Sequence, residues 1–180
     1  MPGAIPAIAD LIASSAAAAG VDPALAVAVA QAESSLNQAA RGAAGEIGVF
    51  QILPSTAPGV NLSDLQTNIT TGVQILRNLI NQFGDIAQAL AAYNCGPGCV
   101  ANALAAGGSN WLAFVPGSTQ AYVARILGSS VSAETASPDA GAPAGDGSGA
   151  GGDTSSTWGT WALVAGLAVG TYFLVDFVTD

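Results

Sequence analysis

The sequence contains no histidine and no lysine, and its only basic side chains are three arginines. Without histidine, neither a Ser-His nor a Cys-His nucleophile system can form, and the commonest metal ligand is missing. Catalysis must therefore depend on carboxylates, hydroxyls, amides or cysteine. Twelve acidic residues give a formal net charge of −9. This balance argues against a nucleic-acid partner, because phosphates require clustered lysine and arginine.

Cysteine is also scarce, since the chain has only Cys95 and Cys99, on either side of a Gly-Pro-Gly turn. Two thiolates cannot complete a structural zinc site, which takes four ligands, so we expect no metal site. An oxidising compartment could join the two sulfurs in a disulfide across the turn, or they could remain two small buried thiols. The sequence leaves both alternatives open.

The composition divides the chain into three parts. Residues 1–127 are apolar and periodic, which predicts one folded domain. Residues 128–157 are rich in Gly, Ser, Ala and Pro and predict a flexible linker. No charged residue occurs in residues 154–175, and we predict a transmembrane helix at 158–178 in preference to a core helix. The start does not resemble a signal peptide, because no basic residue precedes Arg41.

The folded part predicts an all-α domain, since its apolar residues recur at helical spacing. A first helix is expected to stop at Gly20, and Asp22-Pro23 should begin a second at 24–36, buried nearly all round. Further helices are expected at 69–83, from Asp85 through 91, and at 100–106. Thr119 is expected to cap the last one.

Glu33 is the only charged side chain between Asp22 and Arg41. It lies four and eight residues beyond Val29 and Leu25, which places it on or beside the buried face of its helix. Burial would raise the pKa of this carboxyl, as a general acid working near neutrality requires. The alternative is a helix-end carboxylate that reaches solvent.

Three segments carry a resemblance to a known family. They are ESSLN at 33–37 with GEIGVFQILPSTA at 45–57, then AAYNCGPGCV at 91–100, and more weakly VPGSTQAYV at 115–123. In this order they resemble the motifs of lytic transglycosylases with a goose-type-lysozyme-like fold. The resemblance extends over residues 5–127, and it includes the helix at 68–79 that joins the first two motifs.

The resemblance implies a lysozyme-like domain that binds peptidoglycan glycan strands. Glu33 aligns with the family's catalytic glutamate, and Ser34, Gln51, Tyr93 and Asn94 match its substrate-binding positions. The implied reaction cleaves the bond between N-acetylmuramic acid and N-acetylglucosamine without a cofactor. The substrate's own 6-hydroxyl attacks, so one carboxyl suffices where ordinary glycosidases use two.

The chain departs from the family pattern at three positions. Gly42 stands where the family commonly has serine, nine residues after the glutamate, and Ser118 stands where it often has glutamate. Glu46 replaces a residue that is usually small. It could be a second carboxylate that permits hydrolysis, or a loop carboxylate bonded to nearby amides, and we favour the loop role.

Aromatic side chains could stack on sugars, although single aromatics in an α domain more often belong to the core. Of Phe50, Trp111 and Phe114, we expect Trp111 to be the most exposed, because it follows a Gly-Gly pair and Asn110.

The predicted architecture suggests where the protein is located, and it leaves alternatives for both location and function. A wall-cleaving domain with a membrane anchor and no signal peptide suits a bacteriophage virion that opens the wall for genome delivery. Other virion proteins would then be possible partners, and a bacterial inner-membrane location is the alternative. A lysozyme-type hydrolase and a non-catalytic wall-binding or structural virion membrane protein are the alternative functions.

Overall fold

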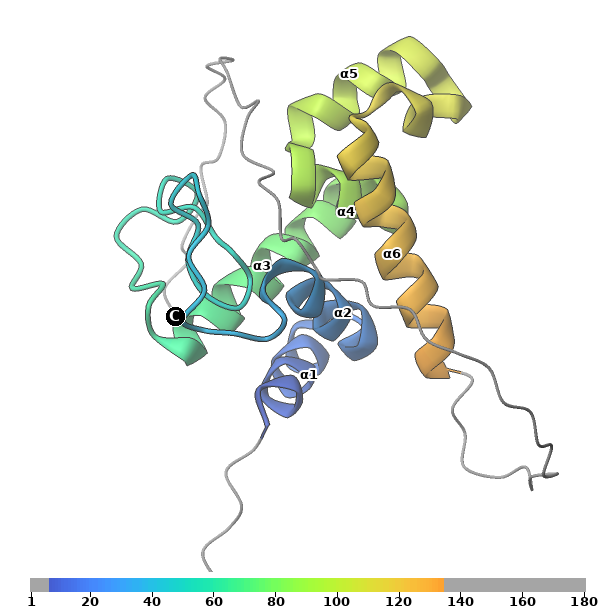
Figure 1. Ribbon diagram of the computed structural model, residues 1–180. Helices are drawn as coiled ribbons and strands as arrows, with labels where there is room; N and C mark the ends of the chain where they lie inside the picture. Colours follow the sequence, from blue (N-terminus) through green and yellow to red (C-terminus); the bar gives the residue numbers. More distant parts are fainter. Residues whose placement is uncertain (1–6, 135–180) are drawn as a thin grey trace, which may run out of the picture. The chain divides into compact units, whose positions relative to one another are not determined.

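The computed structural model of this protein describes residues 7–134, and the regular elements in that range are helices (Figure 1). The all-α prediction is therefore confirmed for this part of the chain. In chain order the elements are α1 (Ile8–Ala19), α2 (Pro23–Ser34), α3 (Leu65–Phe83), α4 (Ile86–Cys95), α5 (Pro97–Gly107), the 3₁₀ helix η1 (Gly108–Phe114) and α6 (Gly117–Glu134).

Aspartates begin three of these helices. Asp22, Asp64 and Asp85 precede α2, α3 and α4, and each accepts a backbone N–H of the first turn at 2.8 Å. Such caps satisfy amide groups that have no partner within the helix. The predicted starts at Asp22 and Asp85 are thus confirmed. The capping by Asp64 was not predicted, and it starts α3 four residues earlier than the apolar stripe indicated.

Helix α2 differs from its prediction in length and in burial. It ends at Ser34, because Ser35 and Leu36 both adopt positive φ angles, of 55° and 61°. The prediction that this helix is buried nearly all round is wrong, since Ala24 and Gln31 are exposed. Small alanine side chains made it look uniformly apolar, but only one stripe is buried. That stripe consists of Leu25, Ala26, Val29 and Ala30.

Helix α6 connects the two halves of the domain. It packs against both α2 and α4, while α1 packs against α2 and α3, and α3 packs against α4. Figure 1 shows α6 running from the α4–α5 hairpin down to α2. Side chains of α2, α4 and α6 can therefore meet although they are far apart in sequence.

The start of α6 corrects another prediction. The backbone N–H groups of Thr119 and Gln120 donate to the carbonyl of Pro116, at 2.9 and 3.0 Å. The helix therefore begins at Gly117, and Thr119 lies inside its first turn, not at the cap. Its side chain is buried, with 1% exposed, and points toward α4.

Residues 35–64 form an irregular loop held by side-chain amides. The buried Asn68 of α3 donates to the carbonyls of Ile47 and Leu62 and accepts the N–H of Phe50, at 2.8, 3.0 and 3.0 Å. The ring of Phe50 lies directly on Gly72, where a β-carbon would overlap with it. A helix position without a side chain thus allows the loop to press against α3.

Two predicted parts lie mostly or wholly outside the described residues. Helix α6 extends through Glu134, past residue 128 where the linker is predicted to begin. Residues 135–157 and the predicted transmembrane helix at 158–178 lie outside the described range. Within residues 7–134, none of the helices has both the length and the apolar character needed to cross a bilayer.

Candidate active site

Glu33 lies in the last turn of α2, one residue before the helix ends. Its side chain is partly buried, and Val29 and Leu25 below it on the same stripe are buried in the core. One oxygen of the carboxyl, Oε1, accepts a hydrogen bond of 2.6 Å from the hydroxyl of Tyr122 on α6. The prediction that Glu33 lies beside the buried face is therefore confirmed, and the carboxyl is held by a second helix.

Burial raises the pKa of Glu33 from 4.5 to about 7. Loss of hydration is the largest cause, because apolar surroundings disfavour the charged form. The hydrogen bond from Tyr122 and the positive charge of Arg125 lower the pKa, and the negative charge of Glu46 raises it. A pKa near neutrality allows this carboxyl both to donate and to accept a proton.

Tyr122 and Arg125 are site residues that the sequence analysis did not identify as such. Tyr122 is buried, and the guanidinium of Arg125 lies 5.8 Å from the centre of its ring, within the range of a cation–π contact. Arg125 also donates to the carbonyl of Ala32, 3.3 Å away. The third motif, at 115–123, already contained Tyr122, but nothing in its spacing indicated a partner 89 residues earlier.

Tyr93 on α4 joins the site from a third element. Its hydroxyl donates to the carbonyl of Phe50 at 2.9 Å. Its pKa is raised, because the group is buried and because the negative charge of Glu33 lies near it. The tyrosine thus lies close to the catalytic candidate and ties α4 to the loop.

Gln51 follows Phe50 in an unusual backbone conformation, with a φ of 45°. Its amide nitrogen donates to the carbonyl of Gly48 at 2.8 Å. The side chain is therefore folded over its own turn and only partly exposed. A positive φ at a residue other than glycine is uncommon, and such residues cluster at active sites and ligand clamps.

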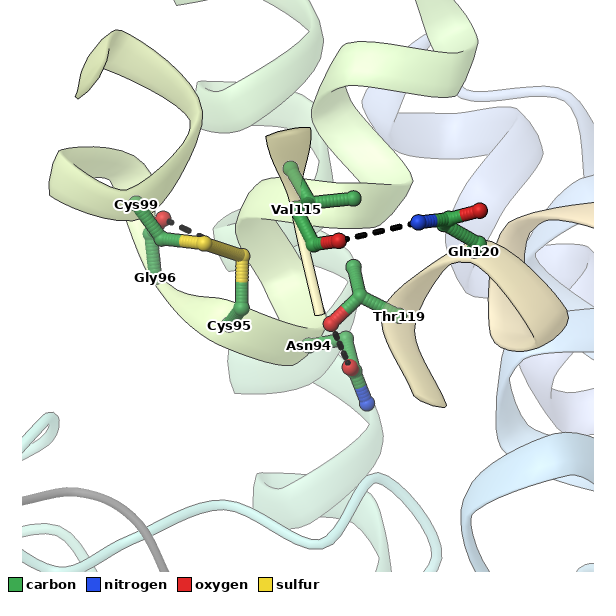
Figure 2. The surroundings of a disulfide bond; sticks show 7 residues. All are labelled: Asn94, Cys95, Gly96, Cys99, Val115, Thr119 and Gln120. Carbon is green, nitrogen blue, oxygen red and sulfur yellow. Dashed lines mark hydrogen bonds between the residues drawn. A yellow bond between two sulfur atoms is a disulfide. The ribbon is translucent and has the colours of Figure 1, made fainter. Parts of the chain in front are cut away.

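Asn94 is positioned by Thr119 and lies next to a disulfide (Figure 2). The hydroxyl of Thr119 donates to Asn94 Oδ1 at 2.8 Å, and Figure 2 shows the amide nitrogen of Asn94 pointing away from Thr119. Cys95 and Cys99 form a disulfide with a Cα–Cα distance of 5.9 Å. This selects one of the two alternatives for the cysteines, and the bond fastens the end of α4 to the start of α5.

Ser34 uses its hydroxyl for backbone contacts. It donates to the carbonyls of Val49 and Ala30, at 2.9 and 3.3 Å, and accepts the N–H of Asn37 at 3.1 Å. These bonds connect the end of α2 to the loop that carries Gln51. In this arrangement Ser34 positions the loop beside Glu33.

Glu46 belongs to a short turn between Arg41 and Ile47, which pair in an isolated β-bridge. The carboxylate oxygen Oε2 accepts the N–H of Ala44 at 3.0 Å. The favoured role, a loop carboxylate bonded to a nearby amide, is therefore observed. The same carboxylate also raises the pKa of Glu33 through its charge, and it belongs to the loop that carries Gln51.

The expectation for the aromatic residues is wrong for Trp111, which is only 8% exposed, whereas Phe114 is 54% exposed. The 3₁₀ helix η1 folds back on α5 and turns the indole into the core. Phe114 leans on Gly107, where a β-carbon would overlap with its ring. Phe50 is fully buried, in agreement with a core role.

The described residues assemble one candidate site from α2, α4, α6 and the loop. Glu33, Tyr122 and Tyr93 converge there. Gln51 follows Phe50, whose carbonyl accepts the Tyr93 hydroxyl, and Asn94 lies one residue beyond Tyr93. No group of three His, Cys, Asp or Glu side chains within residues 7–134 is arranged to hold a metal ion. The arrangement can perform acid–base chemistry with one carboxyl of near-neutral pKa, which suits transfer of a proton to a glycosidic oxygen.

Comparisons with known proteins show the family to which this chain is related. Residues 10–110 match the family described as "Transglycosylase SLT domain". The transglycosylase of Enterobacteria phage PRD1 is 34% identical over 90 residues, which cover 48% of this chain and 34% of that protein. The soluble lytic murein transglycosylase of Escherichia coli (strain K12) is 35% identical over a match of 122 residues, and the match covers 57% of this chain and 19% of that protein.

Two solved structures resemble the fold. An inactive glutamate-to-glutamine mutant of lytic transglycosylase Slt from Pseudomonas aeruginosa matches with a TM-score of 0.61 and 26% identity, over 68% of this chain and 23% of that one. The 70 kDa soluble lytic transglycosylase from Escherichia coli matches with a TM-score of 0.59 and 30% identity, over 67% and 23%. The chain therefore spans about a third or less of the length of these proteins.

Proposed function

Because this chain belongs to the transglycosylase SLT domain family, we propose that it is a peptidoglycan lytic transglycosylase. It cleaves the β-1,4 bond between N-acetylmuramic acid and N-acetylglucosamine and leaves a 1,6-anhydromuramic end. The observation that supports this proposal most directly is the state of Glu33, a partly buried carboxyl with a pKa of about 7 and a tyrosine hydroxyl on one oxygen.

One carboxyl performs both proton transfers in this reaction. Protonated Glu33 gives its proton to the glycosidic oxygen as the bond to the anomeric carbon breaks. The resulting carboxylate takes the proton of the muramic 6-hydroxyl while that oxygen bonds to the anomeric carbon. The net change is one C–O bond broken and one formed, and Glu33 ends protonated as it began. Tyr93, Asn94 and Gln51 offer neutral groups that can orient the sugar.

Product analysis of digested peptidoglycan tests the reaction. We expect anhydromuropeptides in the mass spectrum of the digest, and we expect Glu33→Gln to abolish their release because an amide cannot donate the proton. Lysis undiminished by Glu33→Gln would refute the role of this residue.

Two alternatives predict other outcomes of the same experiment. A lysozyme-type hydrolase would release only hydrated, reducing ends, because water would replace the 6-hydroxyl as the attacking group. A non-catalytic wall-binding or structural protein would sediment with peptidoglycan without cutting it. The effect of the Glu46 charge on the pKa of Glu33 keeps the hydrolase as the second candidate, since hydrolysis with inversion or retention uses two carboxyls.

We further propose that the enzyme is anchored in a membrane through residues 158–178, with the part of the predicted 128–157 linker that follows α6 as a tether. The proposal is supported by the 22 uncharged positions from Thr154 to Val175 and by the length of apolar sequence that a bilayer requires. A virion membrane is the favoured location, because one similar protein is a phage transglycosylase. The bacterial inner membrane is the alternative.

Membrane flotation and analysis of purified particles test this location. The full chain is expected to float with lipid vesicles, whereas a chain ending at residue 157 should stay in solution and retain its activity. Equal flotation of both would contradict the anchor. Detection of the protein in purified phage particles would support the virion location, and its absence from them would refute it.

A further inference from the structure

In the turn beside the active site, the side chain of Glu46 lies where a β-carbon at position 42 would be. A β-carbon added at Gly42 would lie 2.7 Å from the carboxyl carbon of Glu46 and 2.9 Å from its β-carbon, and it would overlap with Oε2. Contacts below 3.0 Å essentially never occur for a real β-carbon. The side chain of Glu46, in the conformation it adopts, therefore fills the volume that a side chain at position 42 would need, and such a side chain would have to displace it.

The turn is built to hold Glu46 in this place. Gly42 donates its N–H to the carbonyl of Glu46 at 2.9 Å, and the carboxylate in turn accepts the N–H of Ala44 at 3.0 Å. The side chain is partly buried, so it folds back over the turn instead of extending into water. Two separate departures from the family pattern, glycine at 42 and glutamate at 46, are thus one packing feature.

We propose that Glu46 is a substrate-positioning residue of the active site and takes the place of the hydroxyl that resembling enzymes carry at position 42. This inference depends on the proposed function. A serine hydroxyl at 42 would lie one bond beyond a β-carbon that overlaps with Glu46 Oε2, so the two oxygens would occupy nearly the same region. Like the hydroxyl, a carboxylate oxygen accepts hydrogen bonds from sugar hydroxyls and amide N–H groups.

A carboxylate has an additional effect that a hydroxyl lacks. The transition state of glycoside cleavage has oxocarbenium character, and a nearby negative charge stabilises the positive charge that develops on the sugar. The groups that act on the charge of Glu33 are Tyr122 and Arg125 from α6 and Glu46 from the turn, and the charge of Glu33 in turn acts on Tyr93 from α4. Of these, Glu46 is the one whose negative charge favours the protonated form of Glu33.

A double-mutant cycle tests the spatial replacement. Gly42→Ser should lower the rate of anhydromuropeptide release because the new side chain displaces the carboxylate. Glu46→Ala should lower it at least about tenfold, as expected for a lost hydrogen bond to a charged group. Gly42→Ser/Glu46→Ala should recover most of the loss, because the hydroxyl then has both the space and the position. If the rate of the double variant is instead reduced by the product of the two single-variant factors, a hydroxyl at position 42 does not substitute for the Glu46 carboxylate, and the proposal is wrong.

Glu46→Gln provides a measurement that a purely structural role would not change. The amide keeps the shape and one acceptor oxygen, but it removes the charge that raises the pKa of Glu33. Because Glu33 must be protonated to act first, the alkaline limb of the pH–rate profile should shift to lower pH. An unshifted limb, with the wild-type rate, would overturn the assignment.

The outcomes separate the two proposals. If the wild-type protein releases no anhydromuropeptides, the proposed function fails and this inference fails with it. If the wild-type protein cleaves and Glu46→Ala, Glu46→Gln and the double variant all cleave as fast, only the role of Glu46 is refuted. Thermal unfolding of each variant identifies any loss of rate that comes from a loosened fold, and a variant with reduced rate must melt like wild type to support the proposal.

Discussion

Replacing Glu33 by glutamine is expected to change stability in a manner that depends on pH. Below pH 4.5 the carboxyl is protonated in the folded and in the unfolded chain, so the substitution should change the free energy of unfolding little. Between 4.5 and about 7 the unfolded chain releases the proton while the folded protein retains it. The wild type therefore loses stability as pH rises through this interval, and the neutral amide does not.

The size of the effect follows from the two pKa values, 4.5 and about 7. One pKa unit corresponds to about 1.4 kcal/mol, so the full difference corresponds to about 3 kcal/mol above neutral pH. Glu33 is partly buried, and solvent reduces the effect, so this is an upper value. Glu33→Gln should therefore be more stable than the wild type at alkaline pH and inactive at every pH.

Urea unfolding at about pH 4, 6 and 8 measures this difference. Asp64→Asn is a control of opposite sign, because the N–H of Thr67 donates to Asp64 and lowers its pKa. Ionised Asp64 stabilises the fold above its unfolded-state pKa. Asp64→Asn should therefore reduce the free energy of unfolding by a larger amount as pH rises. If Glu33→Gln and wild type keep a constant difference across the three pH values, the buried, proton-retaining carboxyl is refuted.

Three further perturbations test other contacts. Tyr122→Phe removes the hydrogen bond that lowers the pKa of Glu33, so the alkaline limb of the pH–rate profile should move to higher pH; a shift to lower pH would contradict this contact. Joint replacement of Cys95 and Cys99 by serine should reduce the free energy of unfolding by about 2 kcal/mol for so short a loop, measured as a lower urea midpoint; an unchanged midpoint would show that the disulfide adds nothing. Asn68→Ala removes three hydrogen bonds and should destabilise the fold by about 3 kcal/mol or more, and wild-type stability would refute its role in holding the loop.

Local signals in the sequence predicted local structure well. Asp22 and Asp85 marked helix starts, Gly20 and Gly84 marked helix ends, and the isolation of one carboxylate marked Glu33. Each of these depends on interactions within a few residues, which a linear pattern contains. The resemblance to a known family supplied Tyr93 and Gln51, which periodicity alone would not have selected.

The errors occurred where tertiary packing decides. Tyr122 bonds to a residue 89 positions away, and that contact exists only because α6 packs on both α2 and α4. Trp111 appeared exposed because its neighbours are polar or glycine, yet η1 turns it inward. Thr119 appeared to be a cap because its residue type suits one, but the helix begins at Gly117, and the Thr119 hydroxyl donates to Asn94 instead. In all three cases the missing information was which helix lies next to which.

A reaction that uses one carboxyl twice restricts the pKa of that carboxyl from both sides. If burial acted alone, Glu33 would hold its proton firmly and its carboxylate would be costly to form after the first transfer. If Tyr122 and Arg125 acted alone, the carboxyl would remain ionised at neutral pH and could not protonate the glycosidic oxygen. The two influences oppose one another, and a pKa of about 7 results. General acid–base catalysis is most effective when the pKa lies near the working pH. The helix that carries Tyr122 and Arg125 is therefore as much a part of the proposed mechanism as the helix that carries Glu33.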